Sequence, residues 1–205
     1  MSRVPEYWED AKMHIRKVDP ILARVIDAHE EPPLRSKLNV FETLVHSIVG
    51  QQISAKAADA VWGRFVSLVG DVTPKNIAAH SPETLRSVGL SGRKVEYIYG
   101  LATESCWICD HPWMDSTSMD VKTSLLALRG VGPWTVEMVL IFSLLKPDVL
   151  PLGDIGVIRS VEQLYADGAR LTKEEVAKIA EPWSPYRTVG TWYLWRHLDA
   201  EPVEY

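Results

Sequence analysis

The sequence predicts an all-α protein, and three of its features support this. Apolar residues recur mostly at intervals of three and four, and no stretch sustains the two-residue alternation of a half-buried strand. Gly and Pro residues divide the 205-residue chain into segments of helical length. Hydrophobic residues make up 46% of the chain and charged residues 24%, which is the composition of an ordinary globular protein rather than of a disordered one.

In the first half of the chain, helices are expected where an apolar stripe follows a capping residue. The stripe over 18–29 ends before Pro32. Asn39 is the expected N-cap of a helix over 40–49, and Ser54 is that of the next helix. Two further helices are expected, a short one from the Ser81-Pro82 pair to about Gly89, and one over 92–104 that Ser91 caps.

The second half of the chain shows the same signals around one interruption. Residues 118–128 have helical spacing, and the stretch Gly130-Val131-Gly132-Pro133 interrupts it. Residues 134–145 are apolar on nearly all sides, so they should form a buried central helix that Pro147 stops. The last three helices are expected after Asp154 or Gly153, over 172–181 behind a capping box, and from the Ser184-Pro185 pair to His197.

Composition excludes several classes of function. The net charge of −5 argues against a protein that coats nucleic acid indiscriminately, although a local basic surface is compatible with it. The chain has two cysteines, Cys106 and Cys109, so a four-thiolate metal site and an iron–sulfur cluster are excluded. No apolar stretch is long enough to span a bilayer, and the N-terminus lacks the apolar core of a signal peptide. We therefore expect a cytoplasmic, nucleoid-associated protein.

The segment from Leu126 to Thr135 is the most informative part of the chain. Two expected helices meet there at a turn that contains Gly130 and Gly132, and glycine tolerates positive φ and the close approach of another backbone. The N-terminus of the second helix presents unpaired N–H groups, for which a DNA phosphate is a natural partner. The same spacing also fits a plain tight corner between two helices, and on spacing alone that simpler interpretation is the commoner one.

The surroundings of this hairpin add a resemblance. A long apolar helix follows it, and then Leu150-Pro151-Leu152-Gly153-Asp154, which places Asp154 22 residues after Gly132. In this arrangement the chain resembles the helix–hairpin–helix (HhH-GPD) DNA glycosylase superfamily, in particular its 3-methyladenine DNA glycosylase II branch, over about residues 40–197. The other segments that carry the resemblance are Gly50-Gln51-Gln52-Ile53-Ser54, residues 88–94, Pro185-Tyr186-Arg187 and Trp195.

The resemblance implies a two-lobed helical fold with the active-site cleft between the lobes. Residues 1–205 would form a single glycosylase domain. Its central lobe would consist of residues 40–145 and include the hairpin. The second lobe would consist of residues 1–39 and 146–205.

The resemblance also implies a monofunctional DNA glycosylase that flips alkylated bases, of the 3-methyladenine and 7-methylguanine type, out of duplex DNA and excises them. Taken alone, Asp154 is an ordinary helix N-cap. In the family it would be the catalytic carboxylate, which stabilises an oxocarbenium-like transition state and activates water as the nucleophile. Bifunctional relatives have a lysine nucleophile two residues after the second hairpin glycine. Trp134 stands there in this chain, so neither a Schiff base nor AP lyase activity is expected.

By the same resemblance, further residues belong to a base-binding pocket and to DNA contacts. Aromatic faces attract the positive charge of an alkylated purine, and the pocket residues would be Trp134, Met138, Trp195 and Tyr186. DNA contacts would come from Gln51, Gln52, Ile53, Ser54, Arg93, Lys94, Gly130, Val131 and Gly132. Gln52 would be the wedge that fills the space of the flipped nucleotide, with Ile53 as the alternative. In the simpler interpretation, Gln51 or Gln52 bonds nearby backbone.

No cofactor is expected for catalysis. In the family the hairpin holds a monovalent cation, Na+ or K+, through backbone carbonyls, which by position would be those of Leu126, Leu128 and Val131. The expected partner is double-stranded DNA that contains alkylated bases, and the protein should be a monomer that binds no membrane. Two alternatives stay open: a non-enzymatic helix–hairpin–helix DNA-binding module, and a glycosylase for deaminated or oxidised bases.

Overall fold

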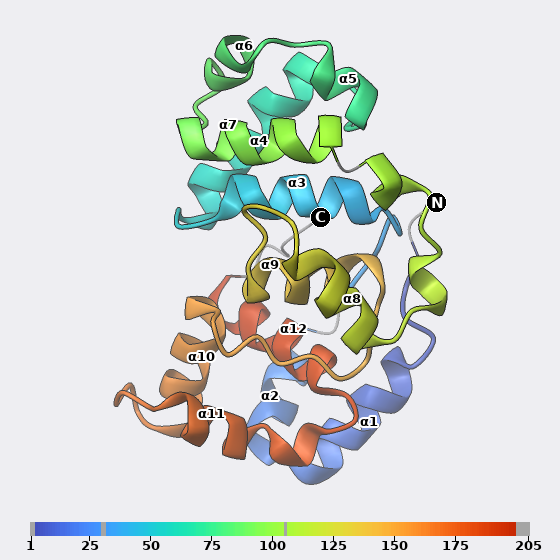
Figure 1. Ribbon diagram of the computed structural model, residues 1–205. Coiled ribbons are helices and arrows are strands. Elements are labelled where there is room, and N and C mark those ends of the chain that lie inside the picture. The colour runs from blue at the N-terminus through green and yellow to red at the C-terminus, as the bar shows by residue number, and fades with distance from the viewer. Residues whose placement is uncertain (1–2, 30–31, 105, 200–205) are drawn as a thin grey trace. The chain divides into compact units, whose positions relative to one another are not determined.

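The computed structural model of the chain consists of helices and the loops that join them (Figure 1). It describes residues 3–29, 32–104 and 106–199, in which no β-strand occurs and a single bridge links Arg3 to Ser36. The prediction of an all-α protein is confirmed. Within these ranges, no helix has the length and apolar character that crossing a membrane requires. In chain order the helices are α1 (Trp8–Val18), α2 (Pro20–Ala28), α3 (Val40–Gly50), α4 (Ala55–Val69), α5 (Pro74–Ala78), α6 (Pro82–Arg86), α7 (Gly92–Glu104), η1 (Cys106–Cys109), η2 (Trp113–Asp115), α8 (Ser118–Leu126), α9 (Pro133–Met138), η3 (Val139–Ser143), α10 (Ile155–Tyr165), α11 (Lys173–Ile179), η4 (Glu181–Trp183) and α12 (Arg187–Leu198).

The chain divides into two compact units. Unit 1 comprises the segments Met1–Leu38 and Leu140–Glu204, and unit 2 comprises Asn39–Val139. The sequence places the second division after residue 145, whereas the structure has it after Val139, within the segment expected as one central helix.

In unit 1, α12 packs against α10, α2 and α1. Aromatic side chains fill this core: Trp8 of α1 lies edge-on to Trp192, with 6.3 Å between the ring centroids, and beside Tyr193. The buried carboxylate of Asp19 caps α2 and accepts a hydrogen bond from Trp183 Nε1 at 2.7 Å. These buried contacts fix the position of α12 within unit 1, and α12 carries Trp195 of the candidate site.

In unit 2, α3 packs against α4, α7 and α9. Every α3 residue from Val40 to Val49 is buried except Glu42, so the helix is enclosed by its neighbours rather than amphipathic. The expected helical hairpin is present, because α8 ends at Leu126 and α9 begins at Pro133.

Local capping signals predicted the helix starts well. Side-chain caps are present at four of the positions that the sequence predicts, Asn39, Ser54, Ser81 and Asp154. The predicted capping box is also present at the start of α11, between Thr172 and Glu175. These caps satisfy backbone N–H groups that have no partner within their own helix.

Two expectations about the helices are wrong. Residues 18–29 are not one helix: Val18 ends α1, which was not predicted, and Asp19 begins α2 because its carboxylate accepts the N–H groups of Ile21 and Leu22. Ser184 does not cap the last helix, because its hydroxyl donates to the carboxylate of Asp148 and α12 begins only at Arg187.

For the central segment, residues 134–145, the predicted burial is confirmed for residues 138–145, but the prediction of one continuous α-helix is wrong. Residues 138–145 are all less than a tenth exposed. After Met138, however, the α-helix widens into the π-helical turn η3. Such turns are rare overall, and those that occur often lie near functional sites. Phe142 of this turn stacks on Trp195, a residue of the candidate site.

Candidate active site

Asp154 lies at the start of α10 and caps that helix. Its Oδ1 accepts the backbone N–H of Val157 at 2.9 Å and the indole N–H of Trp195 at 3.0 Å. The first bond belongs to α10 and the second comes from α12, so two helices hold one carboxylate oxygen. Asp154 and Trp195 are both half-buried. The direction of the carboxylate is therefore fixed in unit 1, while the residue as a whole stays partly accessible.

The indole of Trp195 reaches the carboxylate because position 156 is glycine. A Cβ on Gly156 would lie 3.0 Å from Asp154 Oδ1 and 3.3 Å from Trp195 Cδ1. Phe142 stacks on the indole, with 5.5 Å between the ring centroids and 15° between the planes. Neither Gly156 nor Phe142 was predicted, because each matters only through residues that are distant in sequence or through a missing side chain.

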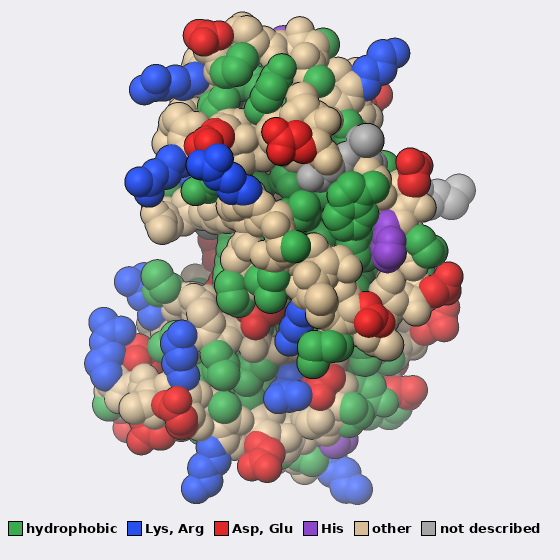
Figure 2. Space-filling view, viewed as in Figure 1, with side chains coloured by type: hydrophobic (Ala, Val, Ile, Leu, Met, Phe, Trp, Pro, Cys, Tyr) green, Lys and Arg blue, Asp and Glu red, His purple; other side chains and the backbone are tan. Residues whose placement is uncertain are grey.

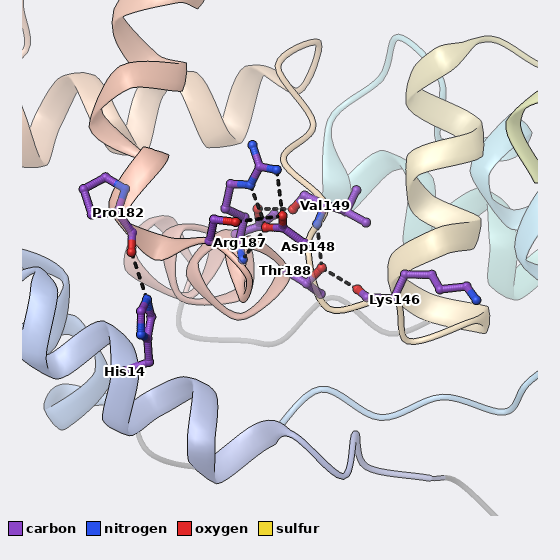
Figure 3. A network of polar contacts seen from close by, with 9 residues as sticks. His14, Lys146, Asp148, Val149, Pro182, Arg187 and Thr188 are labelled. Carbon is purple, nitrogen blue, oxygen red and sulfur yellow. Dashed lines mark hydrogen bonds and ion pairs between the residues drawn. The ribbon is translucent and has the colours of Figure 1, made fainter. Parts of the chain in front are cut away.

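The loop that leads to Asp154, residues 146–153, is bonded to α12 along its first half (Figure 3). Thr188 Oγ1 donates to the carbonyl of Lys146 at 2.6 Å and accepts the N–H of Val149 at 3.0 Å. One hydroxyl of α12 therefore holds two backbone groups of the loop.

An ion pair lies next to this hydroxyl, between Asp148 of the loop and Arg187 of α12 (Figure 3). Arg187 Nε donates to Asp148 Oδ1 at 2.6 Å, and Nη2 donates to Oδ2 at 2.8 Å. The two bonds from the guanidinium hold the pKa of the Asp148 carboxyl below its ordinary value, and they raise the pKa of Arg187. The pair was not predicted, since its members are 39 residues apart in sequence.

In unit 2, the structure requires glycine at one of the two hairpin positions, 130, but not at the other, 132. Gly130 has φ 85°, and a Cβ there would lie 2.2 Å from Cγ of Tyr97, so both backbone and packing require glycine. Gly132 has φ −103°, and a Cβ there would meet none of the described atoms within 4 Å. The packing of the chain itself does not require glycine at position 132, which leaves the start of α9 open. Val131, between them, is buried.

Gln51 braces the hairpin from the turn that follows α3. Its Nε2 donates to the carbonyl of Gly130 at 3.0 Å and to Thr135 Oγ1 at 3.0 Å. Both hydrogens of the amide nitrogen are thus engaged within unit 2. Gln51 thus bonds a backbone carbonyl, but one that lies 79 residues away in the sequence rather than nearby, and it has a supporting role within unit 2.

The two wedge candidates, Gln52 and Ile53, lie on the surface of the same turn. Gln52 is exposed and has φ 60°, a conformation that costs a non-glycine residue energy and that clusters at functional sites. Ile53 is 41% exposed, which is unusual for an isoleucine. Ser54 caps α4 by accepting the N–H of Ala57 at 3.3 Å.

The predicted basic contacts, Arg93 and Lys94, have different surroundings. Lys94 Nζ donates to the carbonyl of Val49 at 2.7 Å, and burial lowers the pKa of this ammonium group. Lys94 thus supports the C-terminal end of α3, whereas Arg93 is exposed. Figure 2 shows Lys and Arg side chains interspersed with Asp and Glu side chains, in keeping with the net charge of −5.

The predicted pocket residues belong to both units, Trp134 and Met138 to unit 2 and Trp195 and Tyr186 to unit 1. Trp134 is half-buried in α9, and Met138 of the same helix is 1% exposed. Tyr186 precedes α12, at the opposite end of that helix from Trp195, and stacks on Tyr7 with 6.0 Å between the ring centroids. Of the pocket residues that belong to unit 1, the structure brings Trp195 to the carboxylate and leaves Tyr186 apart from it.

The hairpin carbonyls proposed for a cation are those of Leu126, Leu128 and Val131. Of these three, Leu128 O accepts the N–H of Val131 at 3.2 Å. All three are neutral carbonyl oxygens, the type of ligand that the predicted Na+ or K+ would need. In the described part of the chain, no group of three His, Cys, Asp or Glu side chains is arranged to hold a metal ion.

Comparison with known proteins places these features in a family. The family model described as "HhH-GPD superfamily base excision DNA repair protein" matches residues 45–185. DNA-3-methyladenine glycosylase 1 of Schizosaccharomyces pombe is 32% identical over 195 residues, which cover 91% of this chain and 86% of that protein. DNA-3-methyladenine glycosylase of Bacillus subtilis is 32% identical over 174 residues; the match covers 78% of this chain and only 57% of the length of that relative.

Solved structures agree with the sequence comparison. The 3-methyladenine DNA glycosylase of Schizosaccharomyces pombe, in complex with abasic DNA, matches with a TM-score of 0.82 and 30% identity, covering 91% of this chain and 95% of the solved chain. A DNA-3-methyladenine glycosidase of Bacillus halodurans matches with a TM-score of 0.69 and 34% identity, covering 97% and 93%. The chain belongs to the HhH-GPD superfamily of base excision DNA repair proteins.

Proposed function

We propose that this chain is a monofunctional DNA glycosylase that excises alkylated bases, of the 3-methyladenine and 7-methylguanine type, from duplex DNA. The geometry of Asp154 carries the proposal: a half-buried carboxylate at the start of α10, bonded to the indole of Trp195. The relatives named DNA-3-methyladenine glycosylase support this choice of substrate.

The carboxylate of Asp154 is the catalytic group in this proposal. When the bond between C1′ of deoxyribose and the base nitrogen breaks, the base leaves with the electron pair and positive charge develops on the sugar. Asp154 stabilises that charge and orients the water whose oxygen adds to C1′ and whose proton it accepts. Because Val157 and Trp195 already hold Oδ1, the group needs no reorientation, and preorganised groups of this kind contribute about 3 kcal/mol.

Aromatic side chains account for the preference for alkylated bases. Alkylation gives a purine a positive charge, which weakens its glycosidic bond and is attracted by electron-rich rings. Trp195, fixed by Phe142, offers such a ring in unit 1, and the half-buried Trp134 offers one in unit 2. Both rings were predicted for the pocket.

The turn after α3 and the hairpin bind and open the duplex. A base inside a duplex must leave the stack before its glycosidic bond can be reached, and the exposed side chain of Gln52 or Ile53 fills the vacated space. The hairpin contacts a phosphate of the strand, with room for the backbone at Gly132. The carbonyls of Leu126, Leu128 and Val131 would hold a monovalent cation, which would supply positive charge for binding the phosphate.

Water is the nucleophile, so the strand is left uncut. The second position after Gly132 is Trp134, which offers no amine for a Schiff base. The product is an abasic site that breaks only after alkali. Trapping of a covalent complex with borohydride would contradict this part of the proposal.

The deciding experiment is the profile of bases released from methylated duplex DNA, separated by chromatography. The proposal predicts release of 3-methyladenine and 7-methylguanine. Binding without release of any base would instead indicate a non-enzymatic DNA-binding module. Parallel assays use duplexes that contain uracil, hypoxanthine or an oxidised purine. Release of these bases, without release of methylated ones from methylated DNA, would indicate a glycosylase for deaminated or oxidised bases.

A further inference from the structure

The ion pair between Asp148 and Arg187 joins the loop that leads to Asp154 to the start of α12. It has no role in the proposed mechanism. The loop over 146–153 has no helix or strand of its own. Its path therefore depends on what it is bonded to, and in its first half that is α12.

Asp148 does more than pair with a charge, because it also caps α12. Tyr186, at the N-cap position, makes no side-chain cap bond in the described structure. In its place Asp148 Oδ1 accepts the backbone N–H of Arg187 at 3.3 Å, while Oδ2 accepts the hydroxyl of Ser184 at 3.0 Å. With the two guanidinium bonds, the carboxylate has four donors, all from the start of α12 or the residues just before it (Figure 3).

The same helix holds the other end of the loop. Trp195 lies about 12 Å further along α12 than Arg187, at a rise of about 1.5 Å per residue, and its indole holds Asp154. Between the two attachment points the loop turns on itself, since the N–H of Asp154 donates to the carbonyl of Pro151 at 2.9 Å. One rigid helix thus fixes both ends of the segment that carries the carboxylate.

We propose that Asp148 and Arg187 are positioning residues for Asp154: the pair fixes the loop to the start of α12, so that the carboxylate meets Trp195 at the other end of that helix. The inference rests on the proposed function of Asp154. A displacement of about 1 Å at a reacting group can reduce a rate about 100-fold, so a pair that acts on loop position affects the chemical step.

The geometry of the pair makes a further demand on residue type. Arg187 donates through Nε and Nη2 to different oxygens of Asp148, a fork that the single ammonium of lysine cannot reproduce. Arg187→Lys keeps the charge and removes the fork, whereas Asp148→Asn keeps the shape and removes the charge.

The test compares these two variants with a matched control. Arg16 and Asp27 form another Arg–Asp pair in unit 1, with Arg16 Nε donating to Asp27 Oδ1 at 2.9 Å. Asp27→Asn removes the charge of that pair away from the loop. For each full-length variant we would measure the single-turnover rate of 7-methylguanine release at saturating enzyme, the Kd for duplex DNA with an abasic site, and the melting temperature.

We expect Asp148→Asn and Arg187→Lys to release the base about 10- to 100-fold more slowly than wild type, with Kd changed less than about 2-fold. Asp27→Asn should keep the wild-type rate and lose less thermal stability, because the Asp27 side chain is more exposed than that of Asp148. A rate loss of equal size in Asp27→Asn, or unaltered rates in both loop variants, would overturn the inference.

A double variant tests whether the pair acts through the carboxylate. Asp148 and Trp195 hold the two ends of one segment, so the rate loss of Asp148→Asn combined with Trp195→Phe should be clearly smaller than the product of the single losses. Multiplying losses would mean independent effects and contradict the inference. An active wild type with unaltered loop variants overturns this inference alone, whereas a wild type that releases no base overturns the proposed function as well.

Discussion

Trp195 Nε1 lies 3.0 Å from Asp154 Oδ1, on the same oxygen that accepts the N–H of Val157. The ring proposed to hold the base and the carboxylate proposed to act on the sugar are therefore parts of one hydrogen-bonded assembly. Gly156 makes this possible by leaving no Cβ between them. A change to either side chain is expected to alter both recognition and chemistry.

Asp154→Asn separates the chemistry from the fold. The amide oxygen of asparagine can still accept the bonds from Val157 and Trp195, so the cap of α10 and the melting temperature should change little. Base release should fall about 100- to 1,000-fold because the negative charge is lost. Rates of base release and Kd for abasic DNA check this, and a variant with wild-type turnover would remove Asp154 from the mechanism.

Trp195→Phe removes the hydrogen bond and keeps an aromatic ring against Phe142. Hydrogen bonds to charged groups contribute about 1.5–3 kcal/mol, so the rate should fall about 10-fold or more. Trp195→Ala, which also removes the ring, should weaken binding of the alkylated base in addition. Equal losses in the two variants would show that the ring has no role beyond its indole N–H, whereas a wild-type rate in Trp195→Phe would show that the N–H has none.

Gly130 and Gly132 form a matched pair for the hairpin. Gly130→Ala places a Cβ against Tyr97 at φ 85° and should lower the free energy of unfolding by about 2 kcal/mol or more. Gly132→Ala meets open space and should leave the melting temperature nearly unaltered, yet weaken DNA binding. Thermal unfolding and DNA titration measure the two effects. Tight DNA binding by Gly132→Ala would contradict a close approach of the strand there.

Gln52→Gly tests whether strain is retained at the wedge. Glycine adopts φ 60° without the energetic cost that glutamine has, but it loses more chain entropy on folding. The free energy of unfolding should therefore rise by about 0.5 kcal/mol. Base release should become slower if this side chain enters the duplex. Ile53→Ala is the companion variant, and whichever of the two slows single-turnover release identifies the wedge.

The Asp148–Arg187 pair predicts a pH dependence of stability. Because Arg187 holds the pKa of Asp148 below its ordinary value, the pair stabilises the fold fully above the pKa of the unfolded chain and is lost as the pH falls through the lower, folded pKa. The difference in free energy of unfolding between wild type and Asp148→Asn should therefore be largest near pH 7 and shrink below about pH 4. Urea unfolding at several pH values measures it, and a constant difference would contradict the assignment.

Features carried by neighbouring residues were the predictable ones. Asn39, Ser54 and Asp154 are caps because each precedes an apolar helical stripe, and the hairpin is marked by its glycines within a few positions. The roles of Asp154 and Trp195 came from a family resemblance, since an aspartate at a helix start is usually only a cap.

Contacts between distant segments had no local signal. The bond from Gln51 to Gly130 spans 79 residues, and nothing in the turn after α3 distinguishes Gln51 from its neighbour Gln52. Ser184-Pro185 has the pattern of a helix start, but the capping carboxylate comes from Asp148. Tertiary packing decided these cases against the local pattern.

The attachment of residues 146–153 to α12 has a consequence for how this segment can vary. Surface loops usually tolerate insertions and deletions, but here the number of residues between Asp148 and Asp154 has to match the distance between Arg187 and Trp195 on a stiff helix. Many substitutions in this stretch could be accommodated, whereas adding or removing a single residue would break the match. Length, more than composition, is the property of this loop that the rest of the protein constrains.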